Sequence, residues 1–98
     1  MTSEIQNLCL AIVTFLGFGE SASPRYDREK IIEIFGSELL DKVLLVLGEA
    51  GDIEVNWSSN LTLAEAGELV RREMQRRHPD FDDLALDAIA WKYTYDWR

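Results

Sequence analysis

The chain has 98 residues, of which 47% are hydrophobic, 29% charged and 10% aromatic, a balance typical of a folded domain and far from that of a disordered segment. Its formal net charge of −8 argues against binding to nucleic acid or anionic lipid, whose phosphates attract basic surfaces. We therefore expect one domain over residues 1–98 whose natural partner is a basic protein. Most of the acidity lies in residues 1–60, which hold ten acidic and four basic side chains.

The first predicted helix spans residues 4–16, where apolar residues recur at helical spacing and the opposite side is also largely apolar. Its run 8–16 is shorter than the ~20 apolar residues that cross a bilayer. Residues 1–7 contain no Lys or Arg to begin a signal peptide. Because Cys9 is the only cysteine and no internal disulfide can form, we expect a cytoplasmic protein.

The next stretch predicts two helices. Residues 23–24 are Ser and Pro, an N-cap followed by a first-turn proline, which predicts a second helix over 24–35. Gly36 ends this helix, and the following serine can cap a third one that closes around 48–51. One bent helix over 24–50 is the alternative.

The pattern then changes at residues 53–57, where apolar and polar residues alternate with the period of a short strand. A polar loop follows. Thr62 and Glu65 form a capping box, which predicts a fourth helix that runs through Arg77.

The last segment predicts a helix capped by Asp80, with apolar residues on two nearly opposite sides. The alternative is a strand over 91–97, where four aromatic residues alternate with polar ones, paired with 53–57. We favour the helix because no Gly or Pro interrupts the segment. The predicted fold is mainly α: a compact bundle of four to five short helices, with a two-stranded β patch as the open alternative.

His78 is the only histidine, so a metal or catalytic site would need Asp80, Asp82 or Asp83 beside it. A helix link followed by a cap explains these residues without any such chemistry. Cys9 lies in an apolar helix as an inert thiol, and no nucleotide-binding loop is present in the sequence. We predict no catalytic residue, cofactor or metal, and keep a small enzyme or metal-binding protein centred on His78 as the last alternative.

The basic cluster at 71–77 shares its helix with acids, and the i,i+4 pairs Glu68–Arg72 and Glu73–Arg77 indicate an exposed helix laced with salt bridges. The leading hypothesis is a non-catalytic acidic interaction module, of the inhibitor or immunity type, that binds a basic protein. The alternative is a homo-oligomer that associates through its first or last helix. The predicted partner-binding residues are Trp91, Tyr93, Tyr95, Trp97, Glu29, Glu33 and Asp41.

Overall fold

The computed structural model describes residues 3–55 and 60–97. These ranges contain five helices and no strand: α1 (Glu4–Leu16), α2 (Arg28–Phe35), α3 (Ser37–Gly51), α4 (Leu63–Arg77) and α5 (Asp83–Asp96). The compact helical bundle is confirmed. The β patch is wrong, because residues 91–96 continue α5 and residues 53–55 form no strand. Residues 56–57 of the proposed strand, including Trp57, lie outside the described residues.

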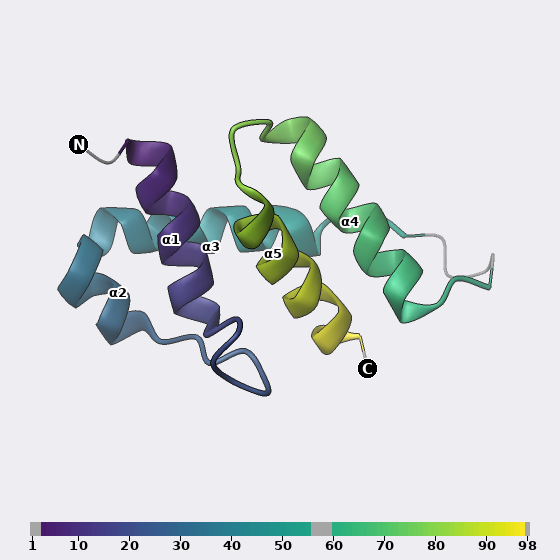
Figure 1. Ribbon diagram of the computed structural model, residues 1–98, viewed down its shortest axis with the longest axis horizontal. Coiled ribbons are helices and arrows are strands. Elements are labelled where there is room, and N and C mark those ends of the chain that lie inside the picture. The colour runs from purple at the N-terminus through teal and green to yellow at the C-terminus, as the bar shows by residue number, and fades with distance from the viewer. Residues whose placement is uncertain (1–2, 56–59, 98) are drawn as a thin grey trace.

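The helices pack around one apolar core (Figure 1). α1 and α5 lie side by side, α4 covers the side of α5 away from α1, and α3 crosses behind them. α2 packs against α1 and α3 at the far end from α4. The largest fully buried side chains are Phe15, Ile12, Leu16, Ile31, Met74, Leu86 and Ile89.

α2 begins at Arg28, whereas the Ser-Pro pair predicted a start at residue 24. The backbone N–H groups of Arg25 and Asp27 instead donate to the last two carbonyl oxygens of α1, at 3.0 and 3.1 Å. These bonds satisfy acceptors that a helix end leaves free, so the chain stays irregular until Asp27 caps α2. Gly36 then separates α2 from α3 with φ of 95° and ψ of 161°, which rules out one bent helix.

The capping box of Thr62 and Glu65 is present at the start of α4, as predicted. The cap of α5 is Asp82, whose side chain accepts a hydrogen bond of 2.8 Å from the N–H of Ala85, so the prediction of Asp80 is wrong. The N–H of Phe81 donates to the carbonyl of His78 at 3.0 Å and forms a turn over 78–81, so the helix begins only after this turn.

α5 does not keep its two apolar sides apart. Its buried residues are Ala85, Leu86, Ala88, Ile89 and Tyr93, which come from both of the predicted stripes. Because α5 contacts α1, α3 and α4, it buries a wide arc of its surface. Arg71 of α4 adds an electrostatic link, since its guanidinium reaches Asp83 at 3.1 Å and Asp87 at 2.7 Å on α5.

Candidate functional site

The outer side of α3 carries a line of exposed residues at helical i, i+3 and i+7 spacing. We name this line the α3 stripe; it consists of Glu38, Asp41, Leu45, Gly48 and Asp52. The opposite side of α3 is held in the core by buried residues, among them Leu40, Val43, Leu47 and Ala50. The core therefore fixes the direction in which the stripe faces, and Leu45 stands on it with 74% of its surface exposed.

The carboxylates of the α3 stripe are not neutralised within the fold. Glu38, Asp41 and Asp52 make no ion pair with any residue in the ranges 3–55 and 60–97. The only basic residue in segment 37–55, Lys42, is already paired with Glu4. The α3 stripe is therefore an acidic surface with an apolar residue near its middle.

Glu29 and Glu33, which sequence reasoning placed among the partner-binding residues, are exposed on α2. The same short helix carries Arg28 and Lys30, so its formal charge is zero. Of the three predicted acids, only Asp41 lies on the α3 stripe. The acidic surface therefore belongs to α3 and the residues that follow it, and not to α2.

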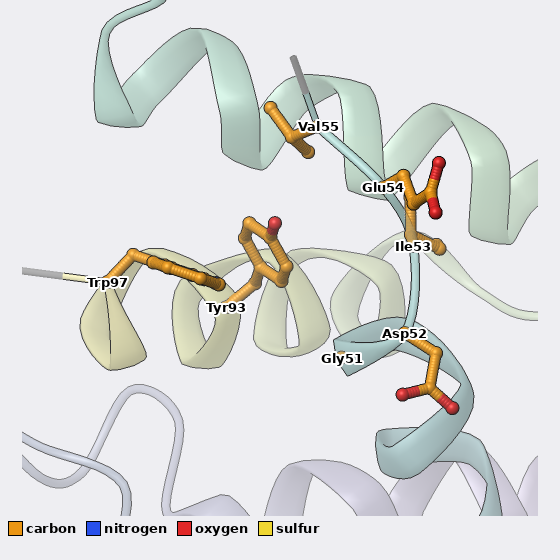
Figure 2. A pocket seen from close by; sticks show the side chains of 7 residues that line it. All are labelled: Gly51, Asp52, Ile53, Glu54, Val55, Tyr93 and Trp97. Carbon is orange, nitrogen blue, oxygen red and sulfur yellow. The ribbon is translucent and has the colours of Figure 1, made fainter. Parts of the chain in front are cut away.

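A groove opens where α3 ends, between residues 51–55 and the last turns of α5 (Figure 2). It has a volume of about 680 Å³ and is lined by Gly51, Asp52, Ile53, Glu54, Val55, Tyr93 and Trp97. Figure 2 shows Tyr93 and Trp97 projecting from α5 on the side where Val55 lies. The carboxylates of Asp52 and Glu54 point away from the two rings. The groove therefore has an apolar floor and an acidic rim, and Asp52 joins it to the α3 stripe.

The four predicted aromatic residues divide between different roles. Tyr93 is only 4% exposed, and its ring centroid lies 6.2 Å from that of Trp97, which is 54% exposed. Burial raises the pKa of the Tyr93 phenol, so this floor of the groove stays uncharged. Trp91 is half-buried against Phe18, with ring centroids 5.3 Å apart, and does not line the groove. Tyr95 is exposed on α5 outside the groove.

His78 makes contacts within the fold. Its Nε2 lies 2.8 Å from a carboxylate oxygen of Glu49, and its ring stacks on Phe81 with centroids 4.5 Å apart. Burial raises the pKa of Glu49, but hydrogen bonds with His78 and Arg77 outweigh it and hold that pKa below its usual value. Asp82 is engaged as a helix cap. Within residues 3–55 and 60–97 no group of three or more side chains could hold a metal ion.

Three of the four arginines of α4 form ion pairs with nearby acids. Arg76 and Arg77 both bond to Glu73, at 2.6 and 3.0 Å, so the predicted Glu73–Arg77 pair is present. Their hydrogen bonds lower the pKa of Glu73 to about 2. Arg71 is also paired, with two aspartates of α5. Arg72 is exposed and makes no ion pair with any residue in 3–55 or 60–97, so the predicted Glu68–Arg72 pair is not formed. One arginine of the four on this helix therefore remains available to an anion.

No family model, curated protein or solved structure matches the chain. In the part of the chain that the structure describes, no helix is both long and apolar enough to cross a membrane. With no similar protein to compare, a function for the chain is inferred from the geometry and charge of the α3 stripe and the adjoining groove.

Proposed function

We propose that this protein is a non-catalytic interaction module that binds a basic protein partner through the α3 stripe and the groove beside it. The observation that carries the proposal is a set of carboxylates in segment 37–55 that no residue in 3–55 or 60–97 neutralises. The set has four members, Glu38, Asp41, Asp52 and Glu54, because the fifth acid, Glu49, is paired with Arg77, and the one lysine of the segment is already paired with Glu4. In residues 60–97, by contrast, only Glu68 and Asp80 have neither an ion pair nor a capping role. The charge is thus concentrated on one side of the fold.

This arrangement combines the two properties that a docking surface needs. An uncompensated acidic face attracts a basic protein over a distance of about 10 Å at 0.1 M salt and speeds the encounter. Leu45 and Trp97 supply exposed apolar contacts, which provide most of the affinity once the charges have oriented the partner. An inhibitor that neutralises a basic enzyme, in the manner of immunity proteins, is the form of this function that suits a small acidic bundle.

The test is capture of partners from the organism's own cell lysate by the immobilised protein over a salt series. The variant Glu38→Gln/Asp41→Asn removes two charges from the α3 stripe. Its matched control, Glu68→Gln/Asp80→Asn, makes the same change in net charge on the α4–α5 half. We expect basic proteins to be captured by the wild type and the control, to be lost from the stripe variant, and to be released as salt rises. Equal capture by both variants, or capture that salt does not weaken, contradicts the proposal.

Self-association is the second candidate, and one observation favours a particular helix, α2, for it. Ile32 and Ile34 are 47% and 57% exposed on α2, the helix without net charge. Two copies could approach there without opposing charges of the same sign. Sedimentation equilibrium of the purified wild type and of Ile32→Ala/Ile34→Ala measures this, and a wild type that remains monomeric at about 100 μM removes this candidate.

A further inference from the structure

Gly48 is a helical glycine that the fold does not require. It lies inside α3, where glycine is less favourable than alanine, and nothing lies within 4 Å of the position that a Cβ would occupy. Gly67 of α4 is different, because the side chain of Thr94 fills the space beside it. The absence of a side chain at Gly48 therefore has no explanation in the contacts of residues 3–55 and 60–97.

Gly48 lies one helical turn beyond Leu45 on the α3 stripe. The missing side chain leaves a notch in the helix surface beside Leu45, which is the most exposed large apolar residue in the ranges 3–55 and 60–97. Two helices pack with their axes 8–10 Å apart, and small residues at the crossing allow the closest approach, about 8 Å. On this basis we propose that a basic helix of the partner crosses α3 at Gly48 and packs on Leu45. This inference rests on the proposed function and adds the point and mode of contact.

The charges decide between a foreign partner and a second copy. Asp41 and Asp52 stand on either side of the Leu45–Gly48 notch, and neither is neutralised by a residue in 3–55 or 60–97. If a second copy packed symmetrically on this face, its carboxylates would lie opposite those of the first copy and repel them, in a chain whose net charge is already −8. Lysines or arginines along the edges of a partner helix would face these carboxylates instead, which is the complementary arrangement.

The probe is a fluorescently labelled helical peptide of about 18 residues, long enough to form a helix, with alanine on one face and lysine along both edges of that face. Binding to the full chain is measured by anisotropy at low salt, and Tm by circular dichroism. For Gly48→Ala we expect a higher Tm, because alanine is the better helix former, together with binding about tenfold weaker, because its Cβ obstructs the close approach. Leu45→Ala should also weaken binding, while Leu84→Ala, at an exposed leucine of α5, should not.

A glycine with only a structural role would give a higher Tm with unchanged peptide affinity, and that result overturns the inference. Loss of binding in Glu38→Gln/Asp41→Asn with full binding in Gly48→Ala and Leu45→Ala also overturns it, while leaving the proposed function in place. Absence of any binding to the wild type, or a dimer that Leu45→Ala dissociates in sedimentation, overturns it as well.

Discussion

The packing of α4 on α5 makes a sharp prediction at Gly67. A Cβ added there would lie 2.6 Å from Cγ2 of Thr94, whereas an ordinary contact is 3.4 Å or more. Thr94 cannot easily rotate away, because its hydroxyl donates a hydrogen bond of 2.9 Å to the carbonyl of Trp91. Gly67→Ala should therefore cost about 1–3 kcal/mol in overpacking, against about 1 kcal/mol gained in helix propensity.

The net effect is a loss of about 1 kcal/mol in the free energy of unfolding, which lowers Tm by about 4–8 °C in a domain of this size. Thermal unfolding followed by circular dichroism measures it. Thr94→Ser removes the obstructing methyl group and keeps the hydroxyl, so the double variant Gly67→Ala/Thr94→Ser should recover most of the lost stability, with a coupling of at least about 0.5 kcal/mol. A rise in Tm for Gly67→Ala alone would refute the packing described for these two helices.

The remaining predictions concern charge, reactivity and the aromatic residues. The pKa of Glu73 is lowered from 4.5 to about 2, so its ion pairs stabilise the fold above pH 4.5 and this stabilisation is lost as the pH falls towards 2. The small difference in Tm between the wild type and Glu73→Gln should therefore disappear between these two pH values. Burial raises the pKa of Cys9, so the native thiol should react with a disulfide reagent far more slowly than the thiol of the urea-unfolded chain, and equal rates contradict its burial. Trp97→Ala should weaken partner capture with little change in Tm, because Trp97 is exposed beside the groove. Trp91→Ala should lower the free energy of unfolding by about 2 kcal/mol and leave capture by the folded protein unchanged. The reverse pattern contradicts the placing of Trp97 in the docking surface and of Trp91 in the packing against Phe18.

Local signals were enough to predict the ends of several helices. The Thr62–Glu65 capping box and the glycine at residue 36 act within one helical turn, so the sequence alone reveals them. The start of α2 is different, because it depends on Arg25 and Asp27 donating to the end of another helix. The alternating residues 53–55 were also misleading, since a strand needs a partner strand and residues 91–96 remain helical.

The candidate site was only partly accessible to sequence reasoning. Of the residues on the α3 stripe and in the groove, Asp41, Tyr93 and Trp97 were among those predicted from the sequence, but Leu45 and Gly48 were not. Helical spacing could have shown that Leu45 lies off the apolar stripe of its helix, between two acids. The groove could not have been found in this way, because it depends on the end of α3 meeting the last turns of α5, which are far apart in the chain.

The most direct test of the acidic docking surface is zero-length cross-linking of the native protein to its captured partner with a carbodiimide, which joins carboxylates to lysines in contact. Mass spectrometry of the cross-linked peptides then identifies the carboxylates involved. We predict cross-links from Glu38, Asp41, Asp52 and Glu54. Cross-links confined to Glu68, Asp80 and the other acids of α4 and α5 would show that the partner binds the opposite half of the fold and would contradict the proposal.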